Sequence, residues 1–301
     1  MARPTVLLAE DNEDHAFLAR RALEAIGATV VLAPGGPEAA HAICAWSGPL
    51  PFLVTLDLAM PMLDGFDVLN LLRGRPATIS GFQPPTDVRW RQVPIVVLST
   101  SRYPKDVSAA YAAGANSYIT KPSVPSEYRA ALTTLGRYWL GLNTPPLFQD
   151  DPGPQVLEVG DWPTMSPRVE TRRILFAEDN EDHAFLIRRS LASTGAQLVH
   201  AVDGEDALDL LKAWTGDPPA VILLDVNMPR LGGLEVLERL RHGDRFARVP
   251  IVIFSTSTLG PDVTRAYDLR ANSYVSKPKA FGDFRRVLEE LSSYWIYVNE
   301  V

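Results

Sequence analysis

A stretch of ten residues occurs twice in this chain, and the repeat limits the possible folds more than any other feature. Residues 9–18 and 177–186 both have the sequence AEDNEDHAFL. An identity of this length indicates an internal repeat, in which each copy forms a unit of the same kind. The copies are 168 residues apart here and 156 apart at Lys121 and Lys277, so the first copy contains 12 additional residues.

Length and charge narrow the class of protein. A chain of 301 residues fits two domains of roughly 150 residues each. The net charge of −7, without a basic stripe, argues against nucleic acid as a partner. No apolar run reaches the ~18 residues of a membrane span, and the first residues do not resemble a signal peptide. We therefore expect a cytoplasmic protein with no membrane partner, whose lone Cys44 forms no internal disulfide.

Short apolar runs alternate with helical patterns in both copies. The runs lie at residues 5–9, 29–32, 52–56, 95–98 and 118–120 in the first copy, and at 174–177, 197–201, 221–224, 251–254 and 273–275 in the second. Helical patterns in the first copy follow residue 9 and cover residues 37–46, 66–72 and 125–142. Each copy is therefore predicted to be an α/β domain with five parallel strands and helices on both faces of the sheet.

The repeat also divides the chain. We expect a first domain at residues 1–143, a linker at 144–171 and a second domain at 172–301. Six prolines in the linker favour a stiff, extended segment. The additional residues of the first copy lie near 75–92, at the edge of the sheet away from the acidic residues. A surface loop is the favoured interpretation, and a partner contact through Phe82 or Trp90 is the alternative.

Charged and polar residues follow the predicted strands at matching places in both copies. They are Glu10, Asp11, Asp57, Ser99 and Lys121 in the first copy, and Glu178, Asp179, Asp225, Ser255 and Lys277 in the second. Because the carboxyl ends of parallel strands form one edge of a sheet, where ligands bind, each set is expected to converge. Taken alone, such an aspartate is more often a turn residue and such a lysine a solvated charge. The whole set in the same order, present twice, favours a functional site.

The three carboxylates of each set indicate a metal. Crowded carboxylates remain ionised together only when a cation joins them. Oxygen donors suit Mg²⁺, which keeps several waters and accepts phosphate oxygens as further ligands. A carboxylate can attack phosphorus as a nucleophile, while a metal and a lysine neutralise charge on the transferred group. The pattern therefore indicates phosphoryl-group chemistry with one Mg²⁺ in each copy.

A family resemblance rests on these residues and their spacing. The matching residues are Glu10-Asp11, DLAMP at 57–61, Ser99, Tyr118 and Lys121-Pro122, and in the second copy Glu178-Asp179, DVNMP at 225–229, Ser255, Tyr274 and Lys277-Pro278. Each copy resembles the receiver domain of two-component response regulators over its full length. The resemblance implies a flavodoxin-like (βα)5 fold and a sensor histidine kinase that phosphorylates Asp57 and Asp225.

The resemblance also implies roles for the surrounding residues. The metal ligands would be Asp11, Asp57 and the carbonyl of Ala59, with Glu10 acting through water, and Asp179, Asp225 and the carbonyl of Asn227, with Glu178 acting through water. The lysine would contact the phosphate, the serine would turn toward it, and Tyr118 or Tyr274 would follow inward. The peptide bonds preceding Pro122 and Pro278 would be cis.

Two shorter motifs indicate a subfamily. The sequence ANSY at 115–118 and 271–274, together with the helix endings YWL at 138–140 and YWI at 294–296, resembles stand-alone receivers that partner bacterial and cyanobacterial phytochromes. This resemblance implies a phytochrome-like histidine kinase as the partner. Core aromatics at a helix end explain Trp139 and Trp295 nearly as well.

The resulting hypothesis is a tandem response regulator without an output domain, which signals or buffers phosphate through contacts with a downstream phosphotransfer or effector protein. It is expected not to be an enzyme, apart from slow loss of its own phosphoryl groups. A Mg²⁺-dependent phosphatase and a constitutive dimerisation scaffold are the alternatives. His15 and His183 are interpreted as surface residues rather than phosphoacceptors.

Apolar residues in the last helix of each copy predict an interface. They are Leu132, Leu135, Trp139 and Leu142, and then Leu288, Leu291, Trp295 and Val298. We expect the two copies to pair through these helices, either within one chain or in a homodimer.

Overall fold

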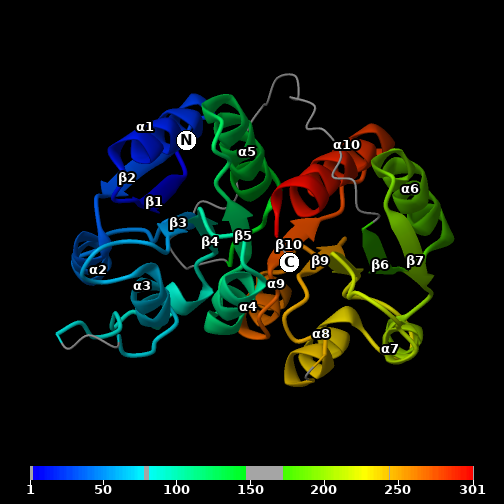
Figure 1. Cartoon of the computed structure of the whole chain (residues 1–301). Helices are drawn as coiled ribbons and strands as arrows, with labels where there is room; N and C mark the ends of the chain where they lie inside the picture. The colour runs from blue at the N-terminus through cyan, green and yellow to red at the C-terminus, as the bar shows by residue number, and fades with distance from the viewer. Residues whose placement is uncertain (1–2, 78–80, 147–171, 244, 301) are drawn as a thin grey trace. The chain divides into compact units, whose positions relative to one another are not determined.

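The computed structural model describes residues 3–77, 81–146, 172–243 and 245–300. Within these ranges the chain forms two compact α/β units (Figure 1). Residues 147–171 of the expected linker and 78–80 of the additional segment lie outside the described residues. None of the helices in the described ranges combines the length and the hydropathy that a membrane crossing requires.

The first unit alternates strands and helices in the order β1 (Thr5–Ala9), α1 (Glu13–Ala25), β2 (Thr29–Ala33), α2 (Gly36–Cys44), β3 (Leu53–Asp57), α3 (Gly65–Leu72), β4 (Ile95–Ser99), α4 (Pro104–Ala113), β5 (Ser117–Thr120) and α5 (Pro125–Arg137). A 3-10 helix, η1 (Val88–Gln92), precedes β4, and a π-helical turn, η2 (Tyr138–Leu142), continues α5. All neighbouring strands are parallel, and the sheet order is β2-β1-β3-β4-β5.

The second unit repeats this arrangement with β6 (Arg173–Ala177), α6 (Glu181–Leu191), η3 (Ala192–Thr194), β7 (Gln197–Ala201), α7 (Gly204–Lys212), β8 (Val221–Leu224), α8 (Gly233–His242), β9 (Ile251–Ser255), α9 (Gly260–Asp268), β10 (Ser273–Ser276), α10 (Phe281–Ser292) and η4 (Ser293–Val298). Its sheet order, β7-β6-β8-β9-β10, is equivalent. The predicted fold class is confirmed, because this strand order is that of the flavodoxin-like fold.

The central strands are covered on both faces. In the first unit α1 and α5 lie on one face of the sheet and α2, α3 and α4 on the other (Figure 1). In the second unit α6 and α10 are opposed to α7, α8 and α9 in the same way. Every residue of β3 and β4 is buried, whereas the edge strand β2 has exposed residues. Burial on both faces explains why the strands appear in the sequence as apolar runs.

Helices α4 and α9 lie between the fourth and fifth strands and complete the alternation of strands and helices in each unit. The buried residues of α4 are Val107 and Ala110, and those of α9 are Val263, Ala266 and Tyr267. In α9 the buried residues have the i, i+3, i+4 spacing of an amphipathic helix, whereas the buried residues of α4 are only two, three positions apart.

The described part of the additional segment packs on its own unit. Trp90, in η1, is 2% exposed and meets Trp46 edge-on, with ring centroids 5.6 Å apart. Phe82 packs half-buried against the core, and its ring lies 5.2 Å from that of His41. The surface-loop interpretation is therefore wrong for these two aromatics, whose large apolar areas favour burial. Trp90 is 156 residues before the buried Phe246, so the additional residues precede it.

Candidate functional site

Asparagine caps place the first helix of each unit directly after the acidic pair. Asn12 Oδ1 accepts a hydrogen bond from the backbone N–H of His15 at 3.0 Å, and Asn180 accepts one from His183 at the same distance. Such a cap satisfies a donor that the first helical turn leaves unpaired. The acidic pair therefore lies in the short turn between β1 and α1, or between β6 and α6, at the carboxyl edge of the sheet.

The ends of β1 and β3 bring three carboxylates together. One carboxylate oxygen from each of Glu10, Asp11 and Asp57 lies within 4.8 Å of the others. Glu10 and Asp57 are buried, at 1% and 6% exposed, while Asp11 is open to solvent. In the second unit the same arrangement is formed by Glu178, Asp179 and Asp225.

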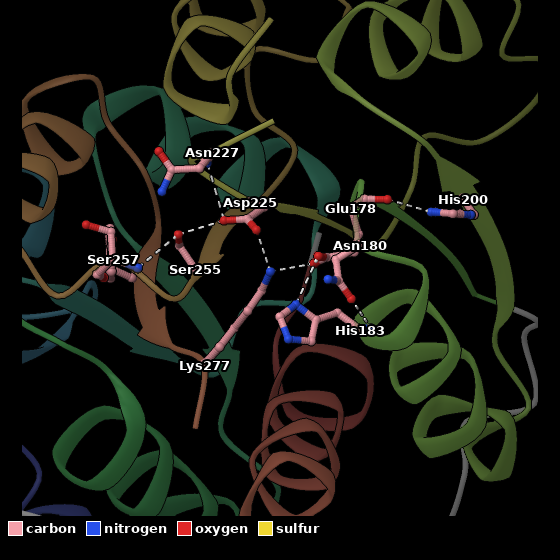
Figure 2. A network of polar contacts seen from close by, with 10 residues as sticks. Glu178, Asn180, His183, His200, Asp225, Asn227, Ser255, Ser257 and Lys277 are labelled. Atoms are coloured by element: carbon pink, nitrogen blue, oxygen red, sulfur yellow. Dashed lines mark hydrogen bonds and ion pairs between the residues drawn. The ribbon is translucent and has the colours of Figure 1, made fainter. Parts of the chain in front are cut away.

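A lysine from the end of the last strand lies between two of these carboxylates. Lys121 Nζ is 2.7 Å from both Glu10 Oε2 and Asp57 Oδ2. Figure 2 shows the second unit, where Lys277 Nζ lies 2.5 Å from Glu178 Oε2 and 2.6 Å from Asp225 Oδ2. Both ammonium groups are almost completely buried, so each lysine depends on the carboxylates for its partners.

The buried glutamates show that the lysine alone does not compensate the negative charge of the site. Burial raises the pKa of Glu10 from its ordinary 4.5 to about 7, and the charge of Asp57 adds to the rise, against the opposing charge and hydrogen bond of Lys121. Burial also raises the pKa of Glu178. A divalent cation fits this site, because its donors are all oxygens and three carboxylates carry more charge than one lysine neutralises.

A serine from the end of β4 or β9 completes each site. Ser255 Oγ donates to Asp225 Oδ1 at 2.6 Å, as Figure 2 shows. In the first unit Ser99 Oγ accepts a hydrogen bond from the backbone N–H of Ser101 at 3.2 Å. The neighbouring Thr100 and Thr256 are exposed, whereas Ser99 and Ser255 are buried, and in the second unit it is the serine that contacts the aspartate.

A chain of hydrogen bonds leads from these serines to the next helix. Tyr118, which is fully buried, donates from its hydroxyl to the carbonyl of Ser101 at 2.9 Å, and Ser101 Oγ donates to Asp106 Oδ2 at 2.5 Å in the first turn of α4. In the second unit Tyr274, Ser257 and Asp262 form the same chain. The loop after the serine therefore connects the acidic site to a buried tyrosine and to a helix.

The loop after β3 or β8 brings its backbone close to the aspartate. The backbone N–H of Ala59 donates to Asp57 Oδ1 at 3.2 Å, and that of Asn227 to Asp225 Oδ1 at 3.4 Å. The roles of the Ala59 and Asn227 carbonyls as metal ligands stay predictions.

Sequence reasoning missed a glycine in the same loop. A Cβ added to Gly65 would lie 2.1 Å from the carbonyl oxygen of Asp57, and one added to Gly233 would lie 2.1 Å from that of Asp225. No other residue allows the helix to approach the strand so closely. The 168-residue spacing of these glycines was the available signal.

The histidines of the repeated motif are partly exposed, but each also contacts the buried glutamate of its site, which sequence reasoning missed. His183 Nδ1 lies 3.2 Å from Glu178 Oε1 (Figure 2), and His15 Nδ1 lies 3.5 Å from Glu10 Oε1. Their side chains are 29% and 31% exposed. The signal for this contact was the position of each histidine, five residues after a site glutamate in both copies.

The expected cis peptide bonds are wrong. The described residues contain no cis peptide bond, so those before Pro122 and Pro278 are trans. Trans is also the favoured isomer, by about 0.5–1 kcal/mol. Both lysines contact their carboxylates with this backbone, so aiming the lysine does not require the cis form.

Comparison with known proteins gives one answer for both units. The model of the response regulator receiver domain family matches residues 6–133 and 174–289. The chain is 38% identical over 128 residues to the probable methanogenesis regulatory protein FilR2 of Methanothrix harundinacea, an alignment that covers 41% of this chain and 83% of FilR2. It is 30% identical over 129 residues to response regulator Rcp1 of Synechocystis sp., covering 41% and 88%. A solved structure, bacteriophytochrome response regulator AtBRR, is 34% identical with a TM-score of 0.36, covering 44% and 99%.

The two matched ranges contain the carboxylates, the serines and the lysines of both sites. They also contain nearly all of the two sheets, each with flavodoxin-like strand order. The chain therefore belongs to the response regulator receiver domain family of two-component signalling, and it contains two copies of that domain.

Proposed function

We propose that this protein is a tandem response regulator that accepts phosphoryl groups from a sensor histidine kinase on Asp57 and Asp225. The observation that supports this most strongly is the buried lysine that contacts both the glutamate and the phosphoacceptor aspartate in each receiver. The proposed receivers occupy residues 1–143 and 172–301, joined by a linker at 144–171.

In the proposed reaction a carboxylate oxygen of Asp57 or Asp225 attacks the phosphorus of a phosphohistidine, and the P–N bond breaks. Mg²⁺, when held by the three carboxylates of the site, would neutralise charge on the phosphoryl oxygens. The lysine, already within 2.7 Å of the aspartate, is placed to pair with the new phosphoryl group. Each aspartate is 6% exposed, which limits attack by water on the acyl phosphate.

The serine and the tyrosine would report the phosphorylated state. Ser255 Oγ already donates to the carboxylate that would carry the phosphoryl group, so it is placed to donate to a phosphoryl oxygen instead. That movement would change the hydrogen bonds from Ser255 through Ser257 to Tyr274. Ser99, Ser101 and Tyr118 would act in the same way in the first receiver.

The proposed partner is a phytochrome-like histidine kinase in the cytoplasm. The motifs ANSY at 115–118 and 271–274 and the aromatic helix endings support this choice. We further propose that the receivers pair through their last helices and pass or buffer phosphate to a downstream protein. Turnover of an outside substrate is not part of this function.

Intact-mass spectrometry after incubation with acetyl phosphate and Mg²⁺ tests the proposal. The parent protein should gain two phosphoryl groups, Asp57→Asn and Asp225→Asn one each, and the double variant none. Asp209→Asn removes an exposed carboxylate of α7 and serves as the matched control. Fewer than two groups on the parent at saturation would show that one site is incompetent. Steady release of phosphate from a phosphomonoester would favour the phosphatase alternative.

A further inference from the structure

One histidine in each receiver is held beside the buried glutamate of the acidic site. His15 and His183 are the third residues of α1 and α6, and their backbone N–H groups bond to the asparagine caps at 3.0 Å. The caps fix the backbone of each histidine in the first helical turn, which follows directly after the acidic pair. The capped first turn of each helix therefore places the imidazole next to the glutamate.

An aromatic ring from the last helix holds each imidazole in place. The ring of His183 stacks on Phe284, with centroids 5.4 Å apart and planes at 27°. The ring of His15 meets Tyr128 edge-on, with centroids 5.6 Å apart and planes at 71°. Phe284 and Tyr128 are both 2% exposed, so they form a rigid support on the inner side of the imidazole.

The carboxylate of Glu178 is thereby contacted on both oxygens. Lys277 Nζ bonds to Oε2 at 2.5 Å, and His183 Nδ1 lies 3.2 Å from Oε1, as Figure 2 shows. Against a carboxylate the histidine nitrogen is the donor. Glu10 has the same neighbours, although His15 Nδ1 is farther away at 3.5 Å.

A glutamate at this position needs such a support. Its side chain has one more rotatable bond than an aspartate, and fixing it costs conformational entropy. The lysine is shared between the glutamate and the aspartate, so the histidine supplies a second, separate contact to the glutamate. We propose that His15 and His183 are positioning residues that orient Glu10 and Glu178 for the metal and its waters. This inference rests on the proposed function.

Metal affinity in the second receiver tests the inference. Titration calorimetry with Mg²⁺ uses the full chain carrying Asp11→Ala, so that the second site alone reports. His183→Ala should weaken Mg²⁺ binding about 10-fold, the lower end of the loss seen when a partner of a metal ligand is removed. His183→Asn, whose amide nitrogen lies close to the place of Nδ1, should recover to within about 3-fold of the parent. His183→Gln, whose amide reaches the place of Nε2 instead, should not recover.

Two further measurements separate positioning from a merely structural role. The Mg²⁺ concentration for half-maximal labelling by acetyl phosphate should rise in His183→Ala, while the rate at saturating Mg²⁺ stays within about 2-fold. In a Glu178→Gln background, His183→Ala should cause no further loss of affinity, because the two residues act as a pair. His242→Ala, on α8, removes a histidine whose Nδ1 bonds to the carbonyl of Glu238, and is the matched control.

The possible results are distinguishable. If the Asp11→Ala parent binds no Mg²⁺, the proposed function fails at its metal site. If that parent binds Mg²⁺ and His183→Ala binds it equally well, the positioning role is overturned. Equal losses in the Asn and Gln variants, or a further loss in the Glu178→Gln background, would likewise overturn it.

Discussion

At the scale of single residues, the buried Glu10 links stability to pH. Its pKa is about 7 in the folded protein and 4.5 in an ordinary environment. Between these values the folded state binds a proton that the unfolded state has lost, so the free energy of unfolding falls as pH rises. The loss is complete above about pH 7 and amounts to up to about 3 kcal/mol.

Urea unfolding in EDTA at several pH values checks this expectation. Glu10→Gln, which mimics the protonated form, should gain stability relative to the parent as pH rises from 4.5 to 7. Glu178→Gln should change in the same direction, because burial raises that pKa too. Glu127→Gln, at an exposed position of α5, is the control. A constant difference between Glu10→Gln and the parent would contradict the prediction.

The residue two positions after each proposed phosphoacceptor differs between the receivers. It is Ala59 in the first and Asn227 in the second, and both are exposed at the edge of the site. An amide there can hold a water molecule beside the aspartyl phosphate, whereas a methyl group cannot. The two aspartyl phosphates should therefore decay at different rates. Decay followed in Asp57→Asn and Asp225→Asn should become similar when Ala59→Asn is added to the latter, and unchanged rates would refute this explanation.

The chemical residues were predictable at this scale, but their contacts were not. Each acidic, serine and lysine residue follows a strand, and strand ends share one edge of a parallel sheet. The contact between His183 and Glu178 instead depends on the cap at Asn180 and on Phe284, a residue 101 positions from His183 in the sequence. A hydrophobic pattern gives no information on such a side-chain contact.

At the scale of elements, a glycine at the start of α3 lies close to the end of β3, and one at the start of α8 lies close to Asp225, which follows β8. Gly65→Ala and Gly233→Ala would each place a Cβ 2.1 Å from a backbone carbonyl, and neither atom is at the end of a flexible side chain. We expect each substitution to lower stability by about 2 kcal/mol or more and to slow labelling of its own receiver by acetyl phosphate.

Gly282→Ala provides the matched control for these glycines. Gly282 lies within α10, and an added Cβ there would meet nothing within 4 Å. Replacing a helical glycine by alanine in open space should raise stability by about 0.5–1 kcal/mol. Thermal unfolding and labelling rates compare the three variants, and parent-like behaviour of Gly65→Ala and Gly233→Ala would show that the loop yields without cost.

The ANSY motif has a structural explanation at the same scale. Asn272 Oδ1 accepts from Arg241 at 2.7 Å and from the backbone N–H of Ile251 at 2.9 Å. Arg241 also donates to the carbonyls of Arg270, Ala247 and Val249, which joins the end of α8 to the loops before β9 and β10. Arg73 and Asn116 form the equivalent contact in the first receiver. The sequence revealed the motif as a family signature, but not this bonding.

At the scale of the whole molecule, the repeat predicted two equivalent receivers and concealed how they differ. In the second, Arg230, in the loop after β8, forms ion pairs with Asp203 and Glu205. The equivalent of Arg230 in the first receiver is Met62, which is 75% exposed. Both residues have positive φ, at 61° and 67°, so the loop keeps its shape while its surface changes. The two copies therefore share the backbone of this loop but differ in the charge that it exposes.

The last prediction concerns pairing of the receivers through their final helices. A linker of 28 residues, 144–171, spans ~30 Å as a flexible chain and gives an effective concentration of roughly millimolar. Trp139→Ala and Trp295→Ala should each weaken pairing, because each removes a large apolar side chain from a final helix. Loss of pairing within one chain would then raise the radius of gyration in small-angle scattering at constant mass. Loss of a homodimer would instead halve the mass in light scattering.

Two controls make the pairing experiment decisive. Trp46→Ala removes a half-buried tryptophan near α2 and should leave mass and scattering unchanged. Mg²⁺ binding should persist in Trp139→Ala and Trp295→Ala, which would show that each receiver remains folded. The contrary result is that these variants bind Mg²⁺ and still give scattering profiles that superimpose on that of the parent. The arrangement of the receivers would then not depend on Trp139 or Trp295, and pairing through the final helices would be contradicted.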